Sequence, residues 1–196
     1  MAIVPNNTDN IDVGRPAKVG GYAFWAPVGT ALPANATADL DEKFVNLGYV
    51  SKDGLSWAPE RDTTDHQDWG GDTVETTQES YGETWTITFI ESLRGDLLKI
   101  LFGPENVTIE EPTAVKEGSI EIKGNSVELP DGVFVFLMKS RKSTRRPILP
   151  NARVTAIGEV KFTPNDLISY QATIKTKPDT AGQHSYQKIG IPKRSA

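Results

Sequence analysis

The chain of 196 residues contains no cysteine, only two histidines and two methionines, and no long hydrophobic run. Without cysteine it has no disulfide, no thiolate zinc site and no cysteine nucleophile, a composition compatible with assembly in a reducing compartment. The longest apolar run, residues 133–138, is far shorter than the ~20 residues that a membrane-spanning helix needs. The first residues also lack the basic and apolar regions of a secretory signal. We therefore expect no membrane anchor.

Motifs of common enzyme sites are also missing. The sequence has no P-loop, no dinucleotide-binding glycine pattern, no HExxH and no GxSxG elbow. Asp65, His66 and Asp68 resemble a metal cluster, but neighbours on one loop seldom converge on an ion and no further ligand is evident. We interpret them as solvated loop charges. We expect no catalytic residue, no cofactor and no metal site.

Charge is unevenly distributed along the chain, although the net charge is only −5. Residues 1–98 carry 6 Lys and Arg against 16 Asp and Glu, whereas residues 99–196 carry 15 against 10. This split argues against a nucleic-acid clamp, which needs a basic excess over its binding face. It allows the acidic surface of one copy to meet the basic surface of another. The alternative is an unselected fluctuation of charge along the sequence.

The length predicts one domain, with polar arms at residues 1–20 and 177–196 around a domain at 21–176. One helix is expected at about residues 92–102, capped by Ser92 and stopped by Gly103 and Pro104. Apolar runs and alternation predict strands at residues 22–27, 44–50, 84–90, 119–123 with 127–129, 133–138, 148–157, 159–162 and 167–176. The run at 133–138 is typical of a strand buried on both faces. The predicted fold is mainly β, a β-sandwich or partial barrel with one flanking helix.

The strand at residues 84–90 shows strict alternation. Its apolar face carries Trp85, Ile87 and Phe89. Its polar face carries Thr84, Thr86 and Thr88. A threonine face favours β-structure and remains polar, so it predicts contact with water or with a wet interface.

A polar stretch at residues 56–82 is expected to be a long loop. It carries Trp57 and Trp69, and tryptophan is common at the anchors of protein interfaces. We interpret both as candidate inter-subunit contacts and expect the loop to be mobile in a monomer and ordered on assembly. The alternative is that both rings fold back onto the core of their own domain.

A basic cluster follows the most apolar strand: Lys139, Arg141, Lys142, Arg145 and Arg146. Such a cluster can bind phosphates, but no aromatic residue interleaves it as a single-strand-binding groove requires. The preferred interpretation is a solvated hairpin tip that also protects a sheet edge from wrong pairing.

Several short motifs occur in a familiar order. They are GGYAFWAPVGTALP at residues 20–33, FVNLGYVSKDGL at 44–55, WGGD at 69–72, the strand at 84–91 and ILPNARV at 148–154. Together, over about residues 20–180, the sequence resembles the major tail (tail tube) proteins of long-tailed bacteriophages, particularly those of actinobacterial hosts.

The resemblance implies a β-sandwich or partial barrel whose copies close into hexameric rings. These rings would stack head to tail into the tail tube, with an acidic lumen that conducts genomic DNA without binding it specifically. It implies further partners, such as tape measure and tube-end proteins, a location in the virion tail after assembly in the host cytoplasm, and no catalytic residue or cofactor.

Two other interpretations stay open. One is another tail or neck component, or the tube subunit of a secretion system, because these share the sandwich. A protein of a different class, a β-sandwich carbohydrate-binding module or hydrolase, would use Trp57 and Trp69 as a sugar platform.

Overall fold

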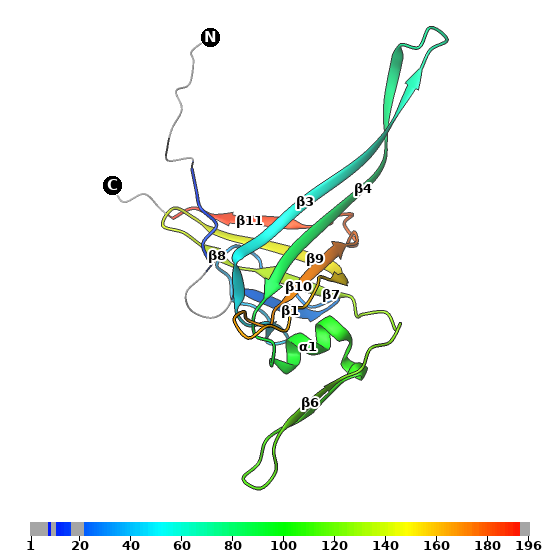
Figure 1. Ribbon diagram of the computed structural model, residues 1–196. Helices are drawn as coiled ribbons and strands as arrows, with labels where there is room; N and C mark the ends of the chain where they lie inside the picture. Colours follow the sequence, from blue (N-terminus) through cyan, green and yellow to red (C-terminus); the bar gives the residue numbers. More distant parts are fainter. Residues whose placement is uncertain (1–7, 9–10, 17–21, 193–196) are drawn as a thin grey trace.

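The computed structural model describes residues 8, 11–16 and 22–192 and is built mainly from antiparallel β-strands around one α-helix (Figure 1). In chain order the elements are β1 (Ala23–Pro27), β2 (Val45–Asn46), β3 (Val50–Gln67), β4 (Thr73–Phe89), α1 (Gly95–Phe102), the 3-10 turn η2 (Pro104–Asn106), β5 (Val107–Glu110), β6 (Ser119–Ile122), β7 (Gly132–Phe136), β8 (Met138–Lys139), β9 (Thr144–Ile157), β10 (Tyr170–Thr176) and β11 (Tyr186–Gly190). The predicted fold class, mainly β with one flanking helix, is confirmed and is consistent with a β-sandwich.

The main sheet runs in the order β2-β1-β7-β9-β10-β4-β3. Strand β9 organises it, because β8 and β11 also pair with β9 in addition to β7 and β10. Strands β5 and β6 form a separate hairpin. The sheet therefore places four strands from the C-terminal half of the chain beside one central strand.

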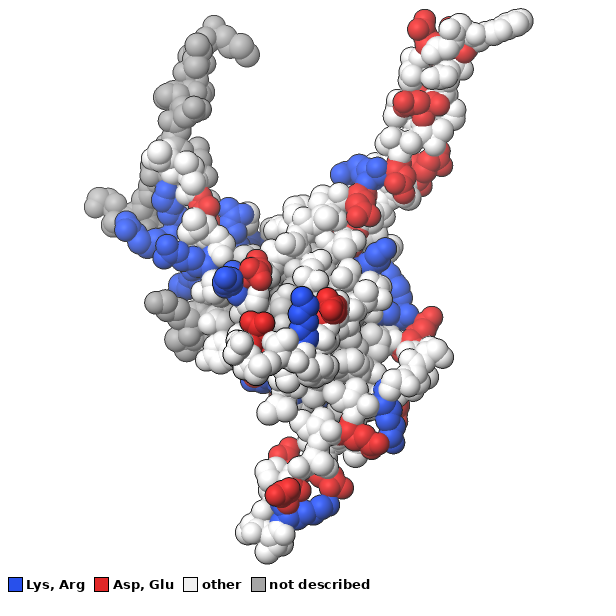
Figure 2. Space-filling model, in the orientation of Figure 1, with Lys and Arg blue, Asp and Glu red and all other residues white. Residues whose placement is uncertain are grey.

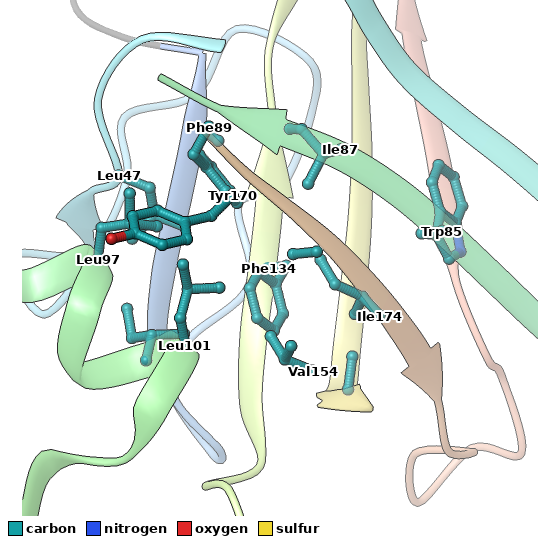
Figure 3. Packing of buried hydrophobic residues seen from close by; sticks show 14 of the residues in the cluster. Leu47, Trp85, Ile87, Phe89, Leu97, Leu101, Phe134, Val154, Tyr170 and Ile174 are labelled. Atoms are coloured by element: carbon teal, nitrogen blue, oxygen red, sulfur yellow. The ribbon is translucent and has the colours of Figure 1, made fainter. Parts of the chain in front are cut away.

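The core lies between α1 and one face of the sheet (Figure 3). Leu97 and Leu101 of the helix point toward Phe134 and Tyr170 of the strands, and all four side chains are buried. The apolar face predicted for the strand at 84–90 is confirmed, since its tryptophan, isoleucine and phenylalanine belong to this core. Burial of such large side chains contributes roughly 1.5–3 kcal/mol each.

Strand β7 is buried on both faces, as its apolar run predicted. Phe134 and Phe136 pack into the main core, whereas Val133 and Val135 join Ile148 in a second cluster. Hydrophobic residues of segment 28–44 and of β11 cover that second cluster. The sheet is thus the middle layer of the structure.

The helix begins at Gly95 rather than at Ser92, which is a correction of the predicted start. Arg94 occupies the N-cap position, and no side chain caps the helix. Glu91 organises the preceding turn instead, accepting hydrogen bonds from the Tyr49 backbone (2.7 Å) and from Arg94 Nε (2.6 Å). The predicted end is confirmed, because Gly103 takes a φ of 94° directly after Phe102.

The prediction of a loop at residues 56–82 is wrong, because this segment belongs to a long hairpin formed by β3 and β4. The hairpin leaves the sheet and projects from the body of the molecule (Figure 1). Beyond its root both faces are exposed, so its residues do not alternate between apolar and polar. Cross-strand pairing satisfies the backbone without any core, and the sequence therefore carries no period-two signal.

Other boundaries also differ. Residues 127–129 form no strand. Residues 159–162 form none either, because the chain leaves the sheet after Gly158, whose N–H donates to the carbonyl of Gln171. The expected C-terminal arm contains β11, and β5 was not predicted. The strand expected at 44–50 is split in two around Gly48, which adopts a φ of 87° and lies against the Glu91 carboxylate.

Candidate functional site

The root of the β3–β4 hairpin is built around the buried carboxylate of Glu83. Its Oε2 accepts hydrogen bonds from the indole N–H groups of Trp57 and Trp85, both at 3.1 Å, and its Oε1 accepts one from the Tyr81 hydroxyl at 2.7 Å. The rings of Trp57 and Trp85, which are cross-strand partners, stack at 5.4 Å. Three donors on one buried carboxylate fix the direction in which the hairpin leaves the sheet.

Tyr81 extends this root toward both strands and the C-terminal segment. The Arg61 guanidinium lies 4.7 Å from the centre of its ring, and His184 meets the ring edge-on at 5.1 Å. The hydrogen bond to Glu83, together with burial, raises the pKa of Tyr81. The root is therefore a cluster of aromatic and polar contacts within one subunit.

Beyond the root the hairpin is a polar ribbon held by its own side chains. Thr76 Oγ1 donates to Asp65 Oδ1 at 2.7 Å, Ser80 Oγ donates to Asp62 Oδ2 at 2.6 Å, and His66 Nε2 lies 3.0 Å from Thr77 Oγ1. Residues 58–83 carry eight Asp and Glu against one Arg. Figure 2 shows these carboxylates along the projecting arm.

The tip is a tight turn with a fully exposed tryptophan. The Gly71 N–H donates to the Asp68 carbonyl at 3.1 Å, and the Asp72 N–H donates to Asp68 Oδ1 at 3.0 Å. Gly71 has a φ of 92°, a conformation that favours glycine. Trp69 lies between the two aspartates in the sequence. Its side chain does not pack against the core and is completely exposed to solvent.

The structure separates the two tryptophans that the sequence grouped together. Trp57 stacks at the root and retains 45% exposure, as the alternative of a ring folded onto its own domain expected, whereas Trp69 is at the tip. Trp69 follows Trp57 by twelve positions of mostly extended chain, which corresponds to roughly 35–40 Å. The two rings do not form one platform.

The three threonines of β4 lie on the outer face of the sheet. Thr84, Thr86 and Thr88 are partly exposed and pair with Lys175, Thr173 and Gln171 of β10. Ser56 and Ala58 of β3 continue this face. The outer surface of β3, β4 and β10 is therefore polar, and its central residues carry few charges.

The three loop residues weighed as metal ligands do not converge. Asp65 and His66 are successive strand residues and point to opposite faces of the ribbon, each bonded to the partner strand. Asp68 is used in the tip turn. Across residues 8, 11–16 and 22–192, no group of three or more acidic, histidine or cysteine side chains is placed to hold a metal ion.

A second polar centre joins the N-terminal segment to the turn between β8 and β9, and no motif of the sequence pointed to it. The Asp12 carboxylate accepts hydrogen bonds from the hydroxyls of Ser140 (2.6 Å) and Ser143 and from Arg145 Nε (3.0 Å). These hydrogen bonds hold the pKa of Asp12 far below its usual range. Lys142 Nζ adds bonds to the backbone carbonyls of Thr8 (2.7 Å) and Ile11 (3.2 Å).

The basic cluster at residues 139–146 does form the tip of a hairpin, between β8 and β9. Arg146 is an exception to its expected exposure, because it is only 5% exposed and donates to the carbonyls of Asn35 and Ala38. Burial lowers the pKa of this guanidinium. The remaining basic residues stay at the surface beside the N-terminal segment (Figure 2).

In the part of the chain that the structure describes, every helix is too short or too polar to span a bilayer.

Three comparisons with known proteins complete these observations. None of the curated proteins compared with the sequence matches it. A solved structure described as the anti-feeding prophage cap, a tube terminating cap, aligns with a TM-score of 0.41 and 15% identity, covering 98% of this chain and 100% of that one. The family model for phage tail tube proteins matches residues 6–189. The chain therefore belongs to the phage tail tube protein family and is a structural component of a phage tail.

Proposed function

We propose that this chain is the repeating subunit of a tail tube. Six copies close into a ring, and rings stack head to tail into a tube that conducts the phage genome into the host. The family match supports the tail role, and the fold supplies a subunit with an extension that its own core does not cover.

The observation that carries this proposal is the projecting β3–β4 hairpin. A two-stranded ribbon exposed on both faces is only marginally stable by itself in water. This ribbon also presents Trp69 fully to solvent, and tryptophan is enriched where proteins bury a contact. A neighbouring subunit would bury this surface. In this proposal Trp69 is an inter-subunit contact, and Trp57 positions the hairpin that carries it.

The polar face with Thr84, Thr86 and Thr88 is a candidate for the lumen or for a wet interface. Apart from Lys175 beside Thr84, this face presents mainly hydroxyl and amide groups, so phosphates would meet few fixed cations and would pass without being held. Half of the carboxylates in the acidic N-terminal part lie on the hairpin. In this proposal, the acidity that the family resemblance places in the lumen also serves contacts between subunits.

Other partners follow from the same role. A tube subunit meets a tape measure protein inside the growing tube and tube-end proteins at its two ends, within a virion tail assembled in the host cytoplasm. The second candidate, another tail or neck component or a secretion-tube subunit, differs in its assembly and is distinguished by the same experiment. No observation favours a sugar-binding role, because the two tryptophans do not share a platform.

Negative-stain electron microscopy of the purified chain tests the proposal. We expect tubes of uniform diameter with sixfold end views, whose length increases with protein concentration. Single closed rings at every concentration would support a neck or end component instead. A chain that stays monomeric at high concentration would contradict the proposed function.

A further inference from the structure

A groove lies between the N-terminal segment and the turn that joins β8 to β9. Its volume is about 1120 Å³. Ile11, Val13 and Tyr22 contribute apolar surface to it, and Lys139 and Arg141 lie at its basic side. The first two apolar residues are more than half exposed, which is unusual for side chains beside a hollow of this size.

The charges around this groove are available to a ligand. Among the described residues that line the groove, Asp12 is the one acidic residue, and it already accepts hydrogen bonds from two serines and from Arg145. Within residues 8, 11–16 and 22–192, Lys139 and Arg141 take part in no ion pair. The groove is therefore apolar inside and positive at its edge.

The tip of the β3–β4 hairpin has the complementary composition. Trp69 is a large exposed ring between Asp68 and Asp72, with Glu75 on the following strand. A ring of this size fills an apolar hollow, and the flanking carboxylates match a basic edge. Arginine and lysine also attract the face of an indole.

From these observations we propose that the hairpin tip of one subunit docks into the basic-edged groove of a second copy, with Trp69 inserted as the anchor. The inference rests on the proposed function, since it names the contact through which the subunits assemble. The hairpin of a chain projects away from its own body, so its tip does not fill its own groove (Figure 1). Tip and groove are different surfaces, and such a heterologous contact extends into an open assembly.

Charge reversal with rescue tests the pairing. Asp72→Lys with Glu75→Lys changes the tip without touching Asp68, and Lys139→Glu with Arg141→Glu changes the groove. Each pair alone is expected to raise the critical concentration for assembly about tenfold or more, whereas a chain carrying both pairs recovers assembly. Glu111→Lys with Glu117→Lys on the exposed segment between β5 and β6 is the matched control and should assemble like the wild type.

Trp69→Ala tests the anchor. Interface anchors of this kind cost tenfold or more in affinity when truncated, so we expect at least about a tenfold rise in the critical concentration. Val74→Ala, another exposed apolar residue on the same hairpin, is the matched control and should change it little.

Cross-linking reads the contact directly, because the chain has no native cysteine. A chain with Gly70→Cys and Val13→Cys should give a ladder of covalent multimers on mild oxidation, whereas Gly70→Cys with Val115→Cys should not. Tubes without this ladder, and without any effect of the charge reversals, would overturn the docking and leave the proposed function standing. A ladder from a chain that forms no tubes would support the docking and contradict the tube.

Discussion

The β3–β4 hairpin and the turn between β8 and β9 are each organised by one carboxylate that accepts three side-chain hydrogen bonds. Glu83 is buried and receives its bonds from two indoles and a phenol, all neutral. Asp12 is partly buried, with its side chain 11% exposed, and receives its bonds from two hydroxyls and a guanidinium. The hydrogen bonds around Glu83 are therefore part of the folded core, whereas those around Asp12 attach the N-terminal segment to the sheet.

The two regions also have opposite charge. The acidic ribbon owes its direction to its root, and its carboxylates point into solvent along the arm (Figure 2). The basic turn is compact, and its single well-bonded acid neutralises only part of the local charge. Opposite charge on two surfaces of one chain favours association between copies over association within one.

The largest expected effect comes from removing the carboxylate at the hairpin root. Glu83→Ala leaves the two indole N–H groups and the Tyr81 hydroxyl without their acceptor, so we expect the free energy of unfolding to fall by about 3 kcal/mol. Chemical denaturation measures this change. Glu79→Ala, an exposed residue of the same strand, should change it by less than about 0.5 kcal/mol. Equal changes in the free energy of unfolding for the two substitutions would contradict the special role of the carboxylate at the root.

Salt should weaken the contact between the acidic and the basic region. The screening length falls from ~10 Å at 0.1 M to ~3 Å at 1 M salt, so we expect the critical concentration for assembly to rise about tenfold over this range. Sedimentation of tubes at a series of concentrations measures it. The charge-reversed groove chain serves as the control, because its dependence on salt should be smaller. Assembly that is independent of salt would remove the electrostatic part of the contact.

Acid should release the N-terminal segment from the turn between β8 and β9. The pKa of Asp12 is lowered in the folded chain, so its contribution is present above the ordinary value of about 3.9 and is lost as pH falls from there toward the folded value. The hydrogen-exchange protection factors of residues 11–16 should therefore be constant around neutral pH and should fall below about pH 4. Asp12→Asn should abolish this pH dependence. Unchanged protection in acid would contradict the role assigned to Asp12.

The smallest effect is expected in the β5–β6 hairpin, which has no comparable centre. Lys116 Nζ lies 2.6 Å from Glu110 Oε2, but both side chains are about half exposed or more. Such surface pairs contribute little, so Lys116→Ala should change the free energy of unfolding by less than about 0.5 kcal/mol. Thermal unfolding of the two chains measures it. A fall in the free energy of unfolding as large as that of Glu83→Ala would contradict the expectation that this exposed ion pair contributes little.

Local patterns predicted the parts of the fold that pack against something. The alternation around Trp85 and the apolar run of β7 were sufficient, because burial imposes a period or a continuous apolar face. The ribbon of β3 and β4 was missed for the same reason, since two exposed faces impose neither. Trp57 and Trp69 lie in similar polar surroundings, and only the cross-strand register separates a stacked ring from an exposed one.

Local sequence patterns could not predict the hydrogen bonds around Asp12. Asp12 meets Ser140 across 128 positions of the sequence, and neither residue belongs to a recognisable motif. The two residues meet because the N-terminal segment runs along β8, where Pro16 bridges to Met138. Long-range contacts between single polar residues leave no periodic signal, so the groove beside them was not predicted either.

Strand β9 gives the molecule a defined mechanical path. Its first residues pair with β8 and β11 beside the groove, and its last residues pair with β10, which pairs with the root half of β4. A pull along the hairpin would load these ladders parallel to the strands, where the hydrogen bonds, perpendicular to the force, resist together in shear. Tension would thus pass from tip to groove through the middle of each subunit, without opening its core.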